Sequence, residues 1–111
     1  MNDRLENIVR QIIQLLQGTI DPQRLILFGS QATRQADDQS DLDLLIIAPS
    51  AERPLERRLR VRRLLREVDK AIGLDILFYT PEEVELFSQE PASFLCQILK
   101  TGITVYDRQT L

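Results

Sequence analysis

The sequence predicts an α/β (α+β) domain in which a mixed β-sheet is flanked by helices. Short apolar runs typical of buried strands alternate with longer segments in which apolar residues recur every three or four positions, as on one face of a helix. Strands interleaved with helices favour helices packed on a sheet over sheets packed on each other. The 111 residues suffice for one hydrophobic core, so we expect a single domain over residues 1–111.

The first predicted helix covers Leu5–Leu16, where leucine, isoleucine and valine recur at helical spacing. Asp3 and Glu6 have the spacing of a capping box, and Gly18 is suited to the end of the helix. The run Leu25–Phe28 has the composition and length of a buried strand. We therefore expect a helix that packs on the sheet, followed by the first strand.

The next segment begins with polar residues and ends in a second strand. Ser30 is placed to cap a short helix over about residues 30–34, and the polar residues 35–40 predict a loop. The run Leu42–Ile47 is apolar on both faces beyond Asp43, as expected of a strand in the middle of a covered sheet. Pro49 ends this strand.

A long helix is predicted over Pro54–Ile72, with its end at Gly73. Its apolar positions follow helical spacing, and its other faces are rich in arginine: Arg53, Arg57, Arg58, Arg60, Arg62, Arg63 and Arg66. Leu74–Tyr79 then predicts a third strand, with Asp75 on the face opposite Leu74. An unpaired carboxylate at the start of a buried strand is costly, so Asp75 calls for a partner or a metal ion.

The C-terminal part predicts two helices and a last strand. Thr80, followed by Pro81 and two glutamates, is a strong helix start, and this helix should end before Pro91. A second helix is predicted from about Pro91 to Lys100, and Ile103–Tyr106 predicts a short strand. The side chains of the second helix expected to face inward are Phe94, Leu95, Ile98 and Leu99.

Composition limits the possible chemistry. The chain has 14 basic and 17 acidic residues and a net charge of −3, which argues against binding nucleic acid by bulk charge. Histidine is absent and Cys96 is the single cysteine, so catalysis would depend on carboxylates and metal, without an internal disulfide. There is no apolar run near the ~20 residues that span a bilayer and no signal peptide, so we expect a cytoplasmic protein.

Two carboxylates define the candidate site. Asp41 and Asp43 are two positions apart at the start of a strand and therefore project from the same face. Because two such carboxylates repel each other, a divalent metal ion is the simplest partner. Gly29 allows close approach of a ligand to the backbone, and Ser30 lies where amide groups would face a phosphate. These residues together predict a nucleotide site.

With these motifs, the chain resembles the polymerase-beta-like nucleotidyltransferase superfamily. It is most similar to the minimal nucleotidyltransferases (MNT), which often serve as antitoxins to HEPN-domain partners. The family pattern has a Gly-Ser turn, an arginine, a Ser-Asp-x-Asp-Leu strand and a third acid on a later strand. This sequence supplies Gly29, Ser30, Arg34, Ser40, Asp41, Asp43, Leu44 and Asp75 in that order.

The resemblance implies a nucleotidyltransferase fold and a metal-dependent transfer of AMP from ATP to a hydroxyl of a HEPN-type toxin, expected to be that of a tyrosine. The chain would then act as an antitoxin, without a membrane or direct nucleic-acid contact. The resemblance assigns Asp41, Asp43 and Asp75 as catalytic residues and ligands of two Mg²⁺ ions, with Asp75 accepting the proton of the attacking hydroxyl. It assigns nucleotide binding to Gly29, Ser30, Arg34 and Ser40.

Other interpretations remain open from the sequence. Gln35 stands where many relatives have glycine, which favours a binding module that neutralises its partner by masking it, without turnover. Transfer to a small molecule such as an aminoglycoside is a weaker possibility, since no additional acceptor domain fits in this length. Asp75 and Arg34 also have an ordinary explanation as solvated side chains. The arginine-rich helix is either a solvated face, a docking face for an acidic partner helix, or an RNA contact, of which we favour protein over RNA.

Overall fold

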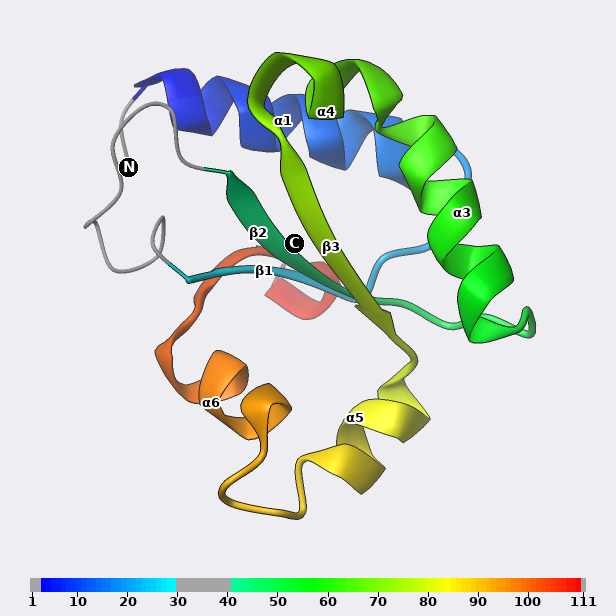
Figure 1. Ribbon diagram of the computed structural model, residues 1–111, viewed down its shortest axis with the longest axis vertical. Coiled ribbons are helices and arrows are strands. Elements are labelled where there is room, and N and C mark those ends of the chain that lie inside the picture. The colour runs from blue at the N-terminus through cyan, green and yellow to red at the C-terminus, as the bar shows by residue number, and fades with distance from the viewer. Residues whose placement is uncertain (1–2, 30–40, 111) are drawn as a thin grey trace.

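In the computed structural model, which describes residues 3–29 and 41–110, helices pack on both faces of a four-stranded sheet (Figure 1). The elements are α1 (Asp3–Gln17), β1 (Arg24–Phe28), β2 (Leu42–Ile47), α3 (Pro54–Leu64), α4 (Arg66–Ile72), β3 (Leu74–Tyr79), α5 (Pro81–Phe87), α6 (Phe94–Thr101), β4 (Ile103–Asp107) and the 3₁₀ turn η1 (Arg108–Thr110).

The sheet is mixed, as predicted, with strand order β3-β2-β1-β4. Strand β1 pairs antiparallel with both β2 and β4, whereas β2 and β3 are parallel. The helices α3 and α4 make the crossover between the two parallel strands (Figure 1). The two central strands are therefore β2 and β1, which explains why their apolar runs are nearly continuous.

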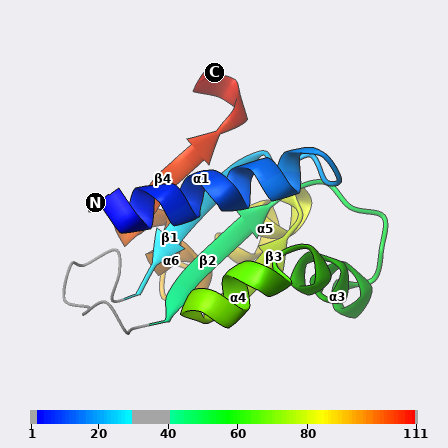
Figure 2. The ribbon, with the colours of Figure 1, turned by 90° about the horizontal axis from the view of Figure 1, so that it is seen from above.

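Two hydrophobic clusters cover the two faces of the sheet. The larger cluster joins α1, α3 and α4 to the sheet through side chains such as Leu16, Leu44 and Leu65. The smaller one packs α6 on the opposite face, where Leu95 and Ile98 meet Leu45. Figure 2 shows α1 on one side of the strands, with α5 and α6 behind them. Helices thus cover both faces of the sheet, so a functional site is expected at the ends of its strands.

The predicted long helix is wrong in one respect, because it is two helices. Helix α3 ends at Leu64 and α4 begins at Arg66, with Leu65 between them at φ −102° and ψ 15°. Leu65 is fully buried, as is Val61, and Val68 is nearly so. The sheet is twisted, so a single straight helix would diverge from it along its length. The bend at Leu65 keeps the apolar side chains of both halves packed on the sheet.

The sequence suggested that the arginines of this segment all lie on faces away from the core, but one of them is buried. Arg57 is only 5% exposed and donates a hydrogen bond to the carbonyl oxygen of Phe78 at 3.2 Å. It also forms an ion pair with Glu83, and its guanidinium lies 5.3 Å from the centre of the Phe78 ring. Arg57 therefore joins α3 to the end of β3 and to α5.

The two C-terminal helices begin at side-chain caps. The Thr80 hydroxyl accepts a hydrogen bond from the Glu83 amide, and the Glu83 carboxylate accepts one from the Thr80 amide, which confirms the predicted helix start. Helix α6 starts at Phe94, later than the predicted Pro91, because Ser93 caps it by accepting a bond from the Cys96 amide.

The inward orientation predicted for Phe94 is wrong. The side chain of this first residue of α6 is 62% exposed, whereas Leu95 and Ile98 are buried as expected. None of the helices within the described ranges is long and apolar enough to cross a membrane.

Candidate active site

Asp43 and Asp75 face each other across the two parallel strands. The register of β2 and β3 pairs Asp43 directly with Asp75. Alternation along each strand puts both on the face that carries Leu45 and Leu77, which is the face covered by α5 and α6. Two acids that are far apart in the sequence therefore meet near the same end of the sheet.

A glycine turn lies against Asp43. Phe28, the last residue of β1, is the register partner of Asp43, and Gly29 follows it with a positive φ of 71°. A Cβ atom added to Gly29 would lie 2.1 Å from Oδ2 of Asp43. Only glycine fits there, for space as well as for backbone conformation, so the backbone of the turn is held beside the carboxylate.

Asp41 lies against a second glycine, which sequence reasoning had treated only as a helix end. Gly73 has a φ of 78°, and a Cβ atom there would lie 2.5 Å from Oδ1 of Asp41. The carbonyl oxygen of Gly73 also accepts a hydrogen bond of 3.0 Å from the amide of Leu42. Gly73 thus lets Asp41 lie over the start of β3, beside the other two acids.

The electrostatics of the cluster are unfavourable to charge on Asp43. Burial raises the pKa of the Asp43 carboxyl, and the charge of Asp75, a hydrogen bond between the two carboxyl groups and the charge of Asp41 raise this pKa further. None of the ion pairs in residues 3–29 and 41–110 involves any of the three acids. A cation bound here would stabilise the ionised form of Asp43.

These acids fit magnesium in chemistry but are not a preformed cage. Carboxylate oxygens are the ligands that Mg²⁺ prefers, and the unfavourable charge on Asp43 is what a divalent ion would offset. Within the part of the chain that the structure describes, no three His, Cys, Asp or Glu side chains are arranged to hold one metal ion. The assignment of Asp41, Asp43 and Asp75 as metal ligands stays a prediction.

Three predicted nucleotide-binding residues, Ser30, Arg34 and Ser40, lie outside the described residues, as does Gln35. Gly29, the fourth, lies at the site. Sequence reasoning missed Gly73, whose close contact with Asp41 depends on the parallel pairing of β2 and β3. A glycine directly after a helix gave no separate signal, because helices commonly end at glycine.

A family model described as polymerase beta nucleotidyltransferase matches residues 10–111 of the chain. A curated relative from Methanocaldococcus jannaschii, whose name proposes a protein adenylyltransferase, is 32% identical over 109 residues. That match covers 94% of this chain and 73% of the relative.

Solved structures share the fold at lower sequence identity. A crystal structure from Sulfolobus solfataricus, described as that of a proposed nucleotidyltransferase, superposes with a TM-score of 0.68 at 17% identity, covering 96% of this chain and 83% of the other. An MNT antitoxin in complex with a tri-AMPylated Shewanella oneidensis HEPN toxin gives a TM-score of 0.54 at 19% identity, covering 95% and 74%. At these identities, the likeness establishes the fold alone.

Proposed function

Because this chain belongs to the polymerase beta nucleotidyltransferase family, we propose that it transfers AMP from ATP to a hydroxyl group of a partner protein and thereby acts as an antitoxin. The observation that carries the proposal is the pairing of Asp43 with Asp75 on neighbouring strands, directly beside the Gly29 turn. Carboxylates next to a close backbone approach suit a reaction at phosphorus, in which positioning and electrostatics do most of the work.

In the proposed reaction, the hydroxyl oxygen of the acceptor forms a bond to the α-phosphorus, the bond from that phosphorus to the bridging oxygen breaks, and pyrophosphate leaves. Asp75, whose side chain is exposed, accepts the proton of the hydroxyl. Asp41, Asp43 and Asp75 would hold two Mg²⁺ ions, which supply positive charge to the triphosphate.

Binding of the triphosphate is assigned to the turn after β1. The absence of a side chain at Gly29 leaves its backbone free to approach a phosphate oxygen, and Ser30 and Ser40 add hydroxyl donors in this proposal. Arg34 would neutralise phosphate charge.

The proposed acceptor is a tyrosine of a HEPN-type toxin. The structural neighbour described above is an MNT antitoxin bound to an AMPylated HEPN toxin, which supports a partner of this kind.

A second candidate function is neutralisation by masking, without turnover. It is favoured by a surface on α3 and α4, here called the basic surface, that faces away from the core. Its exposed residues are Leu55, Arg58, Leu59, Arg62, Arg63 and Arg66. Helices α3 and α4 cover the face of the sheet opposite to Asp43 and Asp75 (Figure 2). A partner can therefore bind there whether or not the acids carry out chemistry.

Intact-mass spectrometry separates the two functions. A HEPN-domain protein is incubated with the chain, ATP and Mg²⁺, with the double variant Asp41→Asn/Asp43→Asn as the control. A gain of one or more AMP units that the double variant abolishes supports transfer. A stable complex without a mass gain supports masking, and a mass gain that persists with the double variant contradicts the assigned site.

A further inference from the structure

Two phenylalanine rings pack on each other, one of them on the strand residue paired with Asp43 and the other largely exposed. The ring centres of Phe28 and Phe94 are 5.8 Å apart, and the rings meet edge to face at 84°. Phe28 is 9% exposed, whereas Phe94 is 62% exposed. Edge-to-face packing on a buried ring holds Phe94 in place while leaving most of its surface open to solvent.

The position of this pair follows from the register of the sheet. Phe28 is paired with Asp43 across β1 and β2, and Asp43 is paired with Asp75 across β2 and β3. Directly paired residues point to the same face, so Phe28, Asp43 and Asp75 form one row across the sheet. Phe94 meets this row at Phe28, on which its ring packs.

The backbone of α6 fixes Phe94 at this place. Ser93 caps the helix through a 3.0 Å bond from the Cys96 amide to its hydroxyl, and the next residue, Leu95, is buried in the smaller core cluster. The ring therefore stands on a rigid element and not on a free loop, and a ligand that covers it gains contact at little cost in ordering.

We propose that Phe94 is the platform on which the base of the nucleotide stacks while its phosphates lie at Gly29 and Asp43. This inference rests on the proposed nucleotidyl transfer and adds the base-binding part of that site. A phenylalanine ring offers a π-face and no hydrogen-bonding group, so it accepts any base and favours the larger purine ring by contact area. Phe94 thus contributes affinity for the base without choosing between adenine and guanine.

The test compares two ligands that differ in the presence of a nucleoside. Dissociation constants for ATP and for inorganic tripolyphosphate are measured with Mg²⁺ on the wild-type chain and on Phe94→Ala. We expect Phe94→Ala to weaken ATP binding about tenfold and to leave tripolyphosphate binding unchanged. Phe94→Leu, which keeps an apolar side chain but removes the ring, should also weaken ATP binding. Phe94→Tyr, which keeps a ring, should bind ATP as the wild type does.

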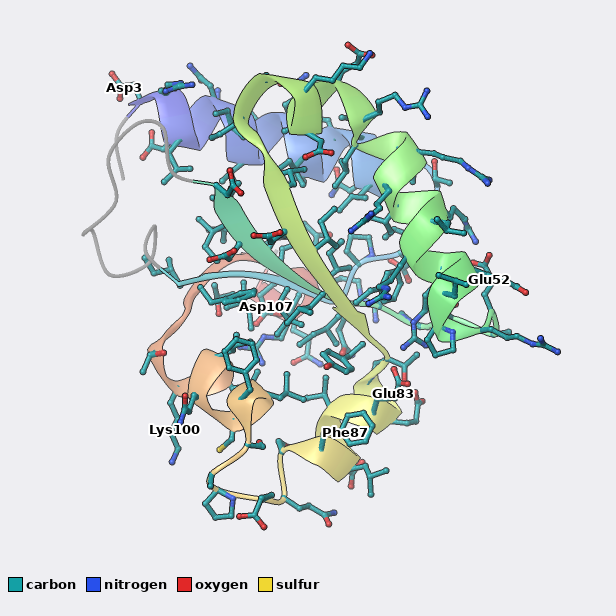
Figure 3. The ribbon with its side chains drawn as sticks, viewed as in Figure 1. Asp3, Glu52, Glu83, Phe87, Lys100 and Asp107 are labelled. Atoms are coloured by element: carbon teal, nitrogen blue, oxygen red, sulfur yellow. The ribbon has the colours of Figure 1, made fainter. Side chains whose placement is uncertain are left out.

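Phe87→Ala is the matched control. Phe87 is also exposed, at 44%, and its ring packs edge to face on Tyr79 with centres 5.8 Å apart. Tyr79 ends β3, so this second pair lies at the other end of the strand from Asp75, and Figure 3 shows Phe87 on α5. Its replacement should change neither dissociation constant.

Each other outcome decides something. If Phe94→Ala binds ATP as tightly as the wild type does, the platform is wrong, and weaker binding of a HEPN-domain partner by the same variant would assign the ring to that partner. Equal loss of ATP and tripolyphosphate binding would also contradict stacking. If the wild-type chain binds ATP no better than tripolyphosphate but still transfers AMP, only the platform fails. If it neither binds ATP nor transfers AMP, the proposed function fails with it.

Discussion

The absence of a side chain at Gly29 allows the turn after β1 to lie against Asp43. An added methyl group would meet Oδ2 of Asp43 at 2.1 Å, and the positive φ of 71° adds strain of about 1–2 kcal/mol for any other residue. We expect Gly29→Ala to lower the free energy of unfolding by about that amount and to reduce ATP binding at least tenfold, because Asp43 must move.

Gly18→Ala is the control for this prediction. Apart from Gly18 itself and its chain neighbours, no atom lies within 4 Å of the position that a Cβ would take at Gly18. Urea titrations and ATP titrations of both variants provide the measurement. Wild-type ATP affinity in Gly29→Ala would show that the close approach of this turn to Asp43 is not used.

Asp43 should make the stability of the chain depend on pH. Its pKa is raised in the folded state above the usual value of 3.8, so folding favours the protonated form. The stabilisation from that proton is fully present below pH 3.8 and is lost as the pH rises through the higher folded pKa. At pH 7 the ionised carboxylate therefore destabilises the metal-free chain.

The variant Asp43→Asn tests this linkage, since it removes the charge at nearly constant volume. We expect a higher urea midpoint than wild type at pH 7 and a difference that shrinks as the pH falls toward 3.8. Added Mg²⁺ should stabilise the wild type more than the variant. A lower midpoint at pH 7 in the variant would mean that the carboxylate is already paired with a cation of the protein.

At the scale of elements, Arg57 joins α3, β3 and α5. It is buried, donates to the carbonyl oxygen of Phe78 and pairs with Glu83. Glu83, labelled in Figure 3, also caps α5. Arg57→Ala removes these contacts and leaves the carbonyl of Phe78 without this donor. We therefore expect the free energy of unfolding to fall by about 2–4 kcal/mol. The loss should be smaller than for breaking a fully buried ion pair, because Glu83 is partly exposed.

Chemical denaturation of Arg57→Ala beside Arg58→Ala measures this contribution. Arg58 is the next residue on α3 and is exposed, so its replacement should change stability by no more than about 0.5 kcal/mol. Equal stability of the two variants would contradict a structural role for Arg57.

The same helix shows what the sequence can and cannot predict. Strands β2 and β3 match their predicted ranges, because uninterrupted apolar runs of strand length have few alternatives. The break at Leu65 has no glycine or proline to mark it, and it arises from packing on the sheet. Arg57 looks like its exposed neighbours in sequence, since its partners Phe78 and Glu83 are more than 20 residues away.

The residues of the candidate site can be proposed from the sequence, but their arrangement cannot. The spacing of Asp41 and Asp43 and the glycine turn indicate acids beside a phosphate site. That Asp75 lies directly opposite Asp43, and that Gly73 packs on Asp41, depends on the parallel register of β2 and β3, a long-range pairing that local patterns do not encode. The exposure of Phe94 depends on Ser93 capping α6 three residues later than expected.

At the scale of the whole molecule, the sheet separates two surfaces of different character. The acids and the phenylalanine pair lie on the face toward α5 and α6, and the basic surface lies on the helices of the other face. Its four arginines form no ion pair among the residues that the structure describes, although the chain as a whole has a net charge of −3. Together with Leu55 and Leu59, exposed at 61% and 42%, they suit a partner segment with acidic and apolar side chains.

Charge reversal on the basic surface should therefore weaken partner binding without affecting nucleotide binding. We expect Arg62→Glu to raise the dissociation constant for the HEPN-domain partner at least tenfold at low salt, with a smaller effect at high salt because screening reduces the attraction. Lys100→Glu makes the same change of charge on α6, where Figure 3 shows Lys100 directed away from the sheet, and should leave partner affinity nearly unchanged.

Titration calorimetry with the partner at two salt concentrations, and with ATP, gives both affinities for each variant. If Arg62→Glu loses partner binding but keeps ATP binding, docking and chemistry are carried by opposite faces of the sheet, and masking remains possible without catalysis. If Arg62→Glu and Lys100→Glu weaken the complex equally, the effect is one of overall charge, and the partner binds elsewhere. Loss of AMP transfer in Arg62→Glu, with ATP affinity intact, would show that docking on α3 presents the acceptor hydroxyl to Asp75.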